Sequence, residues 1–576
     1  MTTLQLRRIT FVCVIALLCF SGSLFAQSPV EKHGALTVKD GKLLDKNGEV
    51  VVLRGMSLFW SQWMPQYYNA KTVNWLVEDW NVTLIRAAMA VESGGYLRNP
   101  AQEKAKVFAV IDACIAANIY VIVDWHDHNA VNHEAEAIGF FKEVAEKYGK
   151  NPHIIYETYN EPLNTHSWAQ IKKYHEAVVS EIRKIDPNNL ILLGSSVWSQ
   201  AVDEASRSPL EGFDNIGYSF HFYASDRGHQ ERLRARADTA IKNGLCIFVN
   251  EWGVSEASGN GAFDVEKTDT WLQWIEENQL SWCVWSIADK RETSATLMPG
   301  ASGDGGWTEN ELSPAGKYIR NRIRALNAIS ALPKTTRAHR IDNTATDNVE
   351  LAAICRWLPG LVELTLGNTK ITDAGLVHLT QLPTLRVIRL SRTAITDAGM
   401  STLAKCEFLE RVDLSQTKIG DFGVWELRAL PRLKDLNLYL TLVTDAGLDS
   451  FRRGDHRSAA KIERLNLDKC PITDAGIAKL SSLTSLAWIH LGGTAITDSS
   501  LIELAKFETL KEAIVTKTET TLAGVEKLRR DRPDINVRDN ISENTPQEEI
   551  EEAAEYRKQL APIRENGSSL QRSRPQ

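Results

Sequence analysis

Cysteine is scarce in this sequence, and the spacings that make cysteine a metal ligand are missing. The 576 residues contain eight cysteines, two of which fall within the first 26 residues. No CxxC or zinc-finger spacing occurs among the other six, which are Cys114, Cys246, Cys283, Cys355, Cys406 and Cys470. We expect buried small side chains, although Cys246 and Cys283 fall on neighbouring expected strands, where one disulfide is compatible with the sequence. The sequence therefore predicts neither a metal centre nor a disulfide framework.

A glycine-rich phosphate-binding pattern is also absent, and neither sign of charge dominates the chain. No such pattern follows any expected strand, which argues against a bound nucleotide or other cofactor. The formal net charge is −7, with both signs scattered along the sequence. This balance argues against a nucleic-acid partner.

Long apolar runs are confined to the N-terminus. Arg7 and Arg8 precede an apolar run from Ile9 to Phe20, and small residues then lead to Ala26. We predict that residues 1–26 are a cleaved signal peptide, which would leave a net charge of −9 and a protein secreted to the periplasm, the cell surface or the medium. An uncleaved anchor is the alternative, but the run is short for a membrane span, and no other stretch could cross a bilayer.

Between about residues 35 and 325, short β-branched runs alternate with amphipathic helical stretches, a pattern typical of a parallel sheet with crossover helices. The expected strands are Val50 to Gly55, Thr83 to Ala88, Tyr120 to Asp124, Ile154 to Tyr159, Leu190 to Gly194, Ile216 to Phe220, Cys246 to Asn250 and Trp282 to Ser286. Eight strands fit an α/β domain of the (β/α)8 (TIM) barrel class better than an open doubly wound sheet. We assign residues 27–325 to this domain.

From about residue 361 the sequence repeats every 24 residues with the frame LxxLxLxxTxITDAGLxxLxxLxx. Seven copies begin at Leu361, Leu385, Leu409, Leu433, Ile462, Leu486 and Leu510, the fourth with a five-residue insertion around 453–458. A threonine or cysteine follows each short strand, at the position that holds Asn or Cys in leucine-rich repeats. One unit has too little apolar surface to fold alone, so we predict an α/β leucine-rich-repeat solenoid over residues 348–538.

Two segments follow neither pattern. Residues 326–347 are rich in Thr, Ala and charge and predict a linker, so that the two domains would be hinged, followed by an atypical first repeat around residues 351–358. Residues 539–576 are polar, with an acidic run from Glu548 to Glu552. This composition predicts a mostly disordered tail with room for one exposed helix.

Polar side chains follow several of the expected barrel strands. They are Arg86, His126, Asn160, Glu161, His221, Tyr223, Glu251 and Trp285. Because all strand carboxyl ends converge on one face of such a barrel, residues ninety positions apart can meet there. Two carboxylates across that mouth suit glycoside cleavage, in which one protonates the departing oxygen and the other attacks the anomeric carbon from about 5 to 5.5 Å away.

The neighbours of the two carboxylates suggest their roles. Arg86 and Tyr223 would keep Glu251 ionised as the nucleophile. Glu161 would be the acid/base, with a pKa raised above that of Glu251 by the nearby negative charge. Asn160 would bond the sugar 2-hydroxyl. Flat faces for stacking on sugar rings are offered by Trp285, Trp63, Tyr96 and Trp198.

Other interpretations of the same residue types carry less weight. The group His126, His128 and His133 suggests a metal site, but no carboxylate triad is placed beside it in the sequence. Trp60, Trp80 and Trp125 are expected in the core rather than at a sugar site.

The segment from about Gly34 to Leu326 resembles the glycoside hydrolase family 5 cellulases, in the subfamily of bacterial endoglucanases. The resemblance rests on stretches such as RGMSLFWSQW, DWNVTLIRAAM, YVIVDWH, IIYETYNEP, HFYAS, FVNEWG and PGASGDGGW. It implies that all eight polar residues named above form an active site, with Glu161 as acid/base and Glu251 as nucleophile. It also implies that Lys290 and Glu292 bind glucose units on the non-reducing side. Phe59, where many relatives have histidine, and the loop Asp127 to His133 depart from the family pattern.

The sequence thus predicts a secreted retaining endo-β-1,4-glucanase, a cellulase that acts on β-glucan by double displacement. The alternatives are the same chemistry on mannan or another β-glycan, and a non-catalytic glycan-binding or adhesion protein, against which the intact Glu161 and Glu251 argue. The repeats resemble bacterial-type leucine-rich repeats, which imply no defined ligand. Their concave face could contact a protein or a polysaccharide, or it could simply face solvent. The residues expected on that face are Arg389, Arg411, Asp435, Tyr439, Arg464, Asp468, Trp488 and His490.

Overall fold

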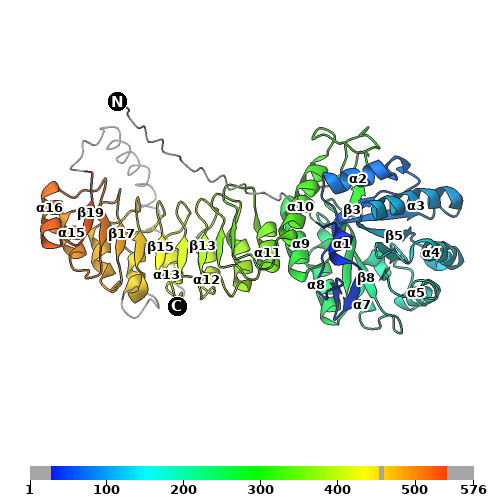
Figure 1. The fold of residues 1–576 in the computed structure, drawn as a ribbon, viewed down its shortest axis with the longest axis horizontal. Helices are drawn as coiled ribbons and strands as arrows, with labels where there is room; N and C mark the ends of the chain where they lie inside the picture. The colour runs from blue at the N-terminus through cyan, green and yellow to red at the C-terminus, as the bar shows by residue number, and fades with distance from the viewer. Residues whose placement is uncertain (1–26, 453–458, 541–576) are drawn as a thin grey trace, which may run out of the picture.

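The computed structural model describes residues 27–452 and 459–540 as two bodies side by side (Figure 1). A rounded body of strands and helices holds the first part of the chain, and an elongated stack of repeats holds the second. The predicted signal peptide, the insertion at 453–458 and the predicted tail from residue 541 onward lie outside the described residues. Within the described residues, no helix has the length and apolarity needed to cross a membrane.

Eight parallel strands close into a barrel in the order β10-β3-β4-β5-β6-β7-β8-β9, which confirms the predicted fold class. The strands are β3 (Arg54–Leu58), β4 (Leu84–Ala90), β5 (Tyr120–His126), β6 (Ile154–Glu157), β7 (Leu190–Leu193), β8 (Ile216–Tyr223), β9 (Ile247–Gly253) and β10 (Trp282–Ile287). Nearly all of their residues are buried, because helices cover the outer face while the side chains of neighbouring strands fill the inside.

Helices surround the barrel. They are α2 (Ala70–Glu78), α3 (Pro100–Ala116), α4 (Glu134–Tyr148), α5 (Trp168–Arg183), α6 (Ser196–Ser199), α7 (Val202–Ala205), α8 (Glu231–Lys242), α9 (Val265–Asn278) and α10 (Pro314–Ala331). Side chains cap the first turn of four of those that the structure describes, α2, α5, α9 and α10. In α5, Ser167 and Gln170 form a capping box that satisfies exposed backbone N–H groups at the first turn.

A short N-terminal segment closes one end of the barrel. It comprises α1 (Pro29–His33) and the antiparallel pair β1 (Thr37–Lys39) and β2 (Lys42–Leu44). Leu36 and Leu43 of this segment share one apolar cluster with Leu84 and Ile122, which come from the barrel strands. The carboxyl ends of the strands, where the candidate site residues stand, are thus the end that is left open.

In the part of the solenoid that the structure describes there are nine parallel, in-register strands, two more than the seven predicted copies supply. They are β11 (Ala338–Arg340), β12 (Glu363–Thr365), β13 (Val387–Arg389), β14 (Arg411–Asp413), β15 (Asp435–Asn437), β16 (Arg464–Asn466), β17 (Trp488–His490), β18 (Glu512–Ile514) and β19 (Asn536–Arg538). The central residue of every strand from β12 to β19 is buried, so the recurring apolar side chains stack into a continuous core.

Short helices and 3-10 turns line the other side of the solenoid. They are η4 (Asp373–Gln381), η5 (Asp397–Gly399), α12 (Met400–Leu403), α13 (Asp421–Leu427), η6 (Gly447–Phe451), η7 (Ala459–Lys461), α14 (Asp474–Ile477), η8 (Ala478–Leu480), α15 (Asp498–Leu504) and α16 (Leu522–Asp531).

The ITDAGL part of the frame joins each repeat to the next. Asp373 accepts hydrogen bonds from the backbone N–H and the hydroxyl of Thr396, one repeat further on. A Cβ atom at Gly399 would lie only 2.5 Å from the same carboxylate, so the close approach requires glycine. The Thr-Asp-Ala-Gly pattern is therefore a lateral staple between successive repeats.

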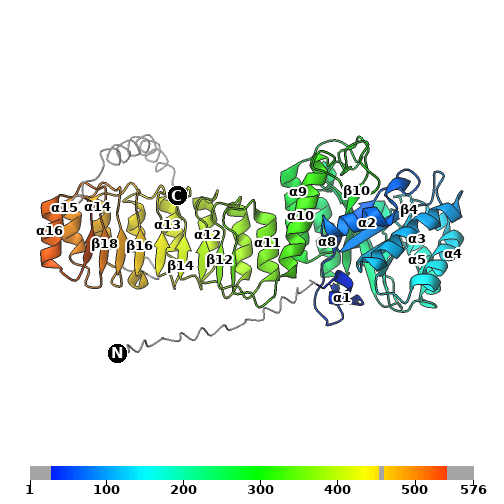
Figure 2. The same ribbon diagram turned by 45° about the horizontal axis from the view of Figure 1, so that its top comes forward.

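Residues 326–347 do not form the hinge-like linker that the sequence predicts. Helix α10 continues to Ala331, because its apolar spacing extends through Leu326 and Ile329, and β11 already belongs to the solenoid sheet. Helix α11 (Asn348–Trp357), where the atypical first repeat is predicted, packs against both α9 and α10. Both views place it between the barrel and the remaining repeats (Figure 1, Figure 2). A packed junction therefore replaces the expected hinge.

All six cysteines in the described residues are free and buried. The disulfide that the sequence allows between Cys246 and Cys283 is therefore not formed in this structure.

Candidate active site

Arg86 is the centre of the polar network at the open end of the barrel. Its guanidinium donates through Nε and Nη2 to the two oxygens of Glu157, at 2.7 and 2.8 Å. Nη1 donates to Glu251 Oε2 at 2.9 Å, and Nη2 donates to Asn160 Oδ1 at 2.6 Å. The side chain is fully buried, so these contacts fix the guanidinium and the groups around it.

Two residues of this network were not singled out in the sequence. Asp124 forms an ion pair with Arg86, with Oδ2 2.9 Å from Nη2, and it contacts His126 Nδ1 at 2.7 Å, while Glu157 accepts two hydrogen bonds from Arg86. Both carboxylates are fully buried. The available signal was an acidic residue inside each of two otherwise apolar strands, because buried charge requires a partner.

Glu251, the last residue but two of β9, has a hydrogen-bond donor on each carboxylate oxygen. Arg86 Nη1 reaches Oε2, and the Tyr223 hydroxyl donates to Oε1 at 3.0 Å. Burial and the charge of Glu161 raise the pKa of Glu251 above its ordinary value. Arg86 and the Tyr223 hydroxyl lower this pKa, but they offset the rise only in part. The predicted contacts to Glu251 are therefore present in the structure.

Glu161 stands immediately after β6 and faces two histidines. His221 Nδ1 lies 3.0 Å from Oε1, and His128 Nε2 lies 3.5 Å from Oε2. Burial raises the pKa of Glu161, but the contacts and charges of His128 and His221 outweigh burial and lower it. The expected order of the two pKa values is therefore wrong, because the expectation considered the charge of Glu251 but not the contact of His128 with Glu161.

Two aromatic rings form the floor beside this network. Trp285 stacks on His126, with ring planes 3° apart and centroids 5.2 Å apart. Phe59 packs against Trp285 at 5.1 Å, and the Lys290 ammonium lies 4.4 Å from the Phe59 ring centroid. Phe59 therefore completes the aromatic packing at the position that departs from the family pattern.

Trp60 belongs to the site rather than to the core, which corrects the expectation for this residue. It lies only partly buried, with its edge toward His126 and its face toward His128. Trp63, next to it, is 53% exposed and so offers a free aromatic face. Trp80 and Trp125 are fully buried, as expected for core residues.

The remaining predicted sugar-binding residues differ in their surroundings. Trp198 is 37% exposed, on a turn where Val197, Trp198 and Ser199 all have left-handed backbone angles. Tyr96 instead packs edge-on against Trp125 and Phe140, which places its ring against the core.

Lys290 and Glu292 form an ion pair with each other. Glu292 also lies beside Gly259, where a Cβ atom would be 2.3 Å from its Oε1. This pair is held on the loop after β10.

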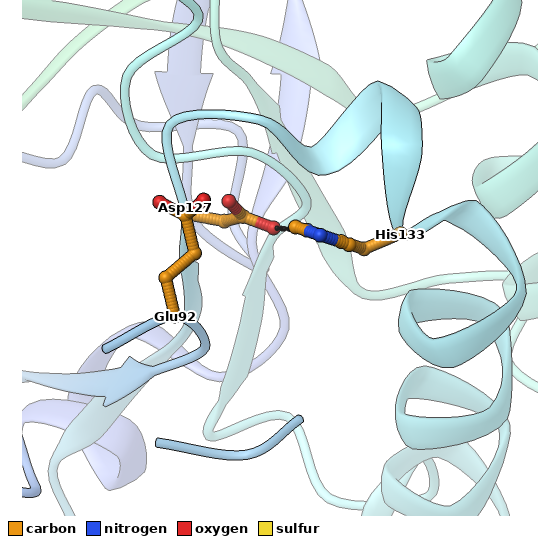
Figure 3. A group of neighbouring side chains, drawn as sticks. All are labelled: Glu92, Asp127 and His133. Carbon is orange, nitrogen blue, oxygen red and sulfur yellow. Dashed lines mark hydrogen bonds and ion pairs between the residues drawn. The ribbon is translucent and has the colours of Figure 1, made fainter. Parts of the chain in front are cut away.

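Glu92, Asp127 and His133, which lie near the site, form a group of potential metal ligands (Figure 3). Asp127 already accepts hydrogen bonds from Trp125 Nε1 and from the backbone N–H of Asn129, and it contacts His133 Nδ1 at 2.7 Å. Glu92 accepts from the Asn129 side chain at 2.9 Å. The Asp127–His133 contact, together with the hydrogen bonds to Trp125 and Asn129, therefore holds the loop after β5.

Comparisons with known proteins match both bodies of the chain. A model of the family described as "Cellulase (glycosyl hydrolase family 5)" matches residues 44–291. A model described as "Leucine Rich repeat" matches residues 381–404 and 459–481. The matched families thus follow the division into barrel and solenoid.

Individual relatives match the barrel. Over 325 residues, 55% of its length, the chain is 41% identical to Endoglucanase 5 of Pectobacterium carotovorum subsp. carotovorum and to Endoglucanase N of Pectobacterium atrosepticum. It spans 64% of the first relative and 72% of the second, so part of each lies outside the match. A solved structure from Cytophaga hutchinsonii is 48% identical, with a TM-score of 0.52, over 52% of this chain and 98% of that one.

Proposed function

The chain belongs to glycosyl hydrolase family 5, and we propose from this membership that it is a retaining endo-β-1,4-glucanase, a cellulase that cleaves internal bonds of β-glucan. One observation carries the proposal. A carboxylate oxygen of Glu161 lies within 4.8 Å of one of Glu251, with His221 in the same group. This spacing suits a retaining pair, since inverting enzymes keep their carboxyl groups about 6.5 to 9.5 Å apart to admit a water.

In the first half of the proposed reaction, Glu251 attacks the anomeric carbon while Glu161 protonates the glycosidic oxygen. The bond to the leaving sugar breaks and a glycosyl ester forms on Glu251. Before attack, Arg86 and the Tyr223 hydroxyl hold the Glu251 carboxylate in place. In the second half, Glu161 takes a proton from a water that attacks the ester and releases a product of retained configuration.

Asn160 is oriented for a contact that would strengthen at the transition state. Arg86 Nη2 donates to its Oδ1, which leaves the amide NH2 group as the donor. A hydrogen bond from this group to the sugar 2-hydroxyl would grow stronger as positive charge develops at the anomeric carbon. Trp63 and Trp198 supply exposed aromatic faces that suit sugar rings.

The substrate assignment rests on the relatives named endoglucanases. Mannan or another β-glycan is the alternative, because the catalytic chemistry would be the same. A passive glycan-binding protein is disfavoured because an arginine, a tyrosine hydroxyl and two histidines are arranged around the carboxylate pair. We further propose secretion through the N-terminal segment, whose sequence pattern is its support.

For the solenoid we propose a spacing role, with ligand binding as the alternative. Charges on its concave face already pair with one another, as Arg389 does with Asp413 and Arg464 with Asp435. The Arg464 guanidinium also lies 4.1 Å from the ring centroid of Trp488, so a ligand would have to displace it to stack there. These contacts favour a face whose charged groups already pair with one another, in keeping with a spacing role.

A substrate panel tests the proposal directly. Carboxymethylcellulose, barley β-glucan and mannan are incubated with the wild type and with Glu251→Ala, and the anomeric configuration of new ends is followed by NMR. The proposal predicts cleavage of the two glucans with retained β-configuration, lost in the variant. Preferential cleavage of mannan would support the alternative substrate, and a folded wild type inactive on all three would reject the enzyme assignment.

A further inference from the structure

His128 lies immediately beyond the carboxyl end of β5, between two carboxylates. Its Nε2 is 3.5 Å from Glu161 Oε2, and its Nδ1 is 3.9 Å from Glu92 Oε2. Trp60 stacks on the ring, with planes 27° apart and centroids 5.6 Å apart. Each ring nitrogen thus faces a different acid, and the indole limits rotation of the imidazole.

The loop that carries His128 is fixed on both sides. The buried Asp127 carboxylate accepts from the backbone N–H of Asn129 and contacts His133 Nδ1 (Figure 3). The Tyr159 hydroxyl donates to the backbone carbonyl of His128 at 2.8 Å. The side chain of Asn129 donates to Glu92, which ties the second carboxylate to the same loop. The conformation of this loop, held by these contacts, therefore directs His128 toward Glu161.

We propose that His128 is a positioning residue that stores the proton of the acid/base and returns it, in a His128–Glu161 relay that the negative charge of Glu92, 3.9 Å from His128 Nδ1, supports. The inference rests on the proposed function, since it refines the acid/base half of double displacement. The relay differs from the His221 contact, which faces the other oxygen of Glu161.

The charges around His128 favour a shared proton. Glu161, Glu92 and Glu251 raise its pKa against the opposing effect of burial. The His126 ring lies 6.4 Å away, and the pKa of His126 is well below its usual value because of burial and the Arg86 charge. Before a substrate binds, these charges favour a proton on His128 beside an ionised Glu161.

Substrate binding would shift this proton. A sugar chain that covers the pair removes water, which disfavours the charged imidazolium–carboxylate form relative to the neutral form. The proton then passes from His128 Nε2 to Glu161 Oε2. Glu161 in turn gives the proton to the glycosidic oxygen while the bond between that oxygen and the anomeric carbon breaks. When Glu161 later takes a proton from the attacking water, the pair regains the proton it gave up.

The pH dependence of kcat/KM tests the relay with two substrates. Cellotetraose needs protonation of its leaving group, whereas the dinitrophenolate of 2,4-dinitrophenyl β-cellobioside leaves without it. The variants are His128→Asn and Glu92→Gln. The control is His166→Asn, which removes an imidazole whose hydrogen bond is with the Tyr159 hydroxyl.

With cellotetraose, we expect the basic limb of the kcat/KM profile to lie about one pH unit lower in His128→Asn than in the wild type. The reason is that the His128–Glu161 pair holds its last proton at least as tightly as Glu161 alone. Glu92→Gln should move this limb less, in the same direction, and the control should leave it in place. With the activated substrate, kcat/KM of His128→Asn should stay within about threefold of the wild type. An unmoved limb, or equal losses on both substrates, would overturn the relay. A wild type inactive on both substrates would reject the proposed function instead.

Discussion

At the scale of single residues, the proposed nucleophile is held by donors that come from different strands. Arg86 on β4 and Tyr223 on β8 each satisfy one oxygen of Glu251 on β9. The barrel brings these strands together, so the contacts that favour the ionised form of Glu251 come from the tertiary fold rather than from its sequence neighbours.

Tyr223→Phe removes one donor while the ring packing stays. We expect kcat/KM for cellotetraose to fall by about 10- to 100-fold, since a hydrogen bond to a charged group contributes about 1.5 to 3 kcal/mol. Tyr223 lowers the pKa of Glu251, so its loss raises that pKa. Because Glu251 must be ionised to attack, the acidic limb of the profile should move to higher pH.

The control for this variant is Tyr218→Phe, which lies on the same strand. The Tyr218 hydroxyl accepts from the backbone N–H of Leu210, away from the carboxylates. It should lower stability without moving the acidic limb. An acidic limb that moved equally in both variants would contradict the role of Tyr223.

The sequence was sufficient to place the main site residues, because strand carboxyl ends converge in a barrel of this type. It was insufficient for the order of the two pKa values. That order depends on His128, whose direction is set by the Asp127 and Tyr159 contacts of the loop after β5. Trp60 was misplaced for a related reason, since a tryptophan beside a strand end suits core and site equally well in sequence.

At the scale of elements, the turn threonine found in six of the seven copies closes the strand that it follows. In the second copy, the Thr393 hydroxyl donates to the Leu390 carbonyl at 2.6 Å, and the residue is buried. The same bond recurs 24 residues away at Thr369 and Thr417. The hydroxyl thus does for these repeats what Asn or Cys does in other leucine-rich repeats.

Thr393→Val tests this role with a side chain of nearly equal shape. We expect the free energy of unfolding of the solenoid to fall by about 1 to 3 kcal/mol, because a buried carbonyl loses its donor. Thr380→Val is the control, since Thr380 makes a similar bond to Val377 in an exposed position and should change stability by less than about 0.5 kcal/mol. Urea denaturation monitored by circular dichroism measures both, and equal effects would argue against the buried turn bond.

The repeat frame also shows where prediction from sequence ends. Its period located β12 to β18 because the apolar positions recur without interruption. The terminal strands β11 and β19 were missed as repeats, because end units lose the frame where they no longer stack on both sides. Helix α10 likewise continued into the expected linker.

At the scale of the whole molecule, the barrel and solenoid meet through a cluster of charges around the buried Arg322. Arg322 on α10 contacts Asp269 on α9, together with Asp347 and Glu350 at the start of α11. Asp347 also caps α11 in a capping box with Glu350. One arginine thus connects the last helices of the barrel to the first helix of the solenoid.

Stability of this junction should decrease with rising pH. Burial, reinforced by the charge of Asp347, raises the pKa of Glu350 to about 7, above its ordinary value. A carboxyl with a raised pKa in the folded state contributes stability below its unfolded value of about 4.5, and this is lost as pH rises through about 7. Glu350→Gln should therefore show a smaller fall in Tm between pH 5 and pH 8 than the wild type.

Calorimetry at the two pH values measures this difference. Glu363→Gln is the control, since Glu363 pairs with Arg340 on the solenoid sheet away from the junction. It should keep the wild-type fall in Tm. If Glu350→Gln also kept the full fall, the junction would not be the source of the pH dependence.

The central claim is that Glu161 and Glu251 act by double displacement, and trapping the glycosyl ester tests it most directly. The wild type is incubated with 2,4-dinitrophenyl 2-deoxy-2-fluoro-β-cellobioside, and the intact mass and labelled peptide are determined by mass spectrometry. The account predicts one fluorocellobiosyl group attached to Glu251, and none in Glu251→Gln. A label on Glu161, or an unlabelled enzyme that releases products of inverted configuration from glucan, would contradict it.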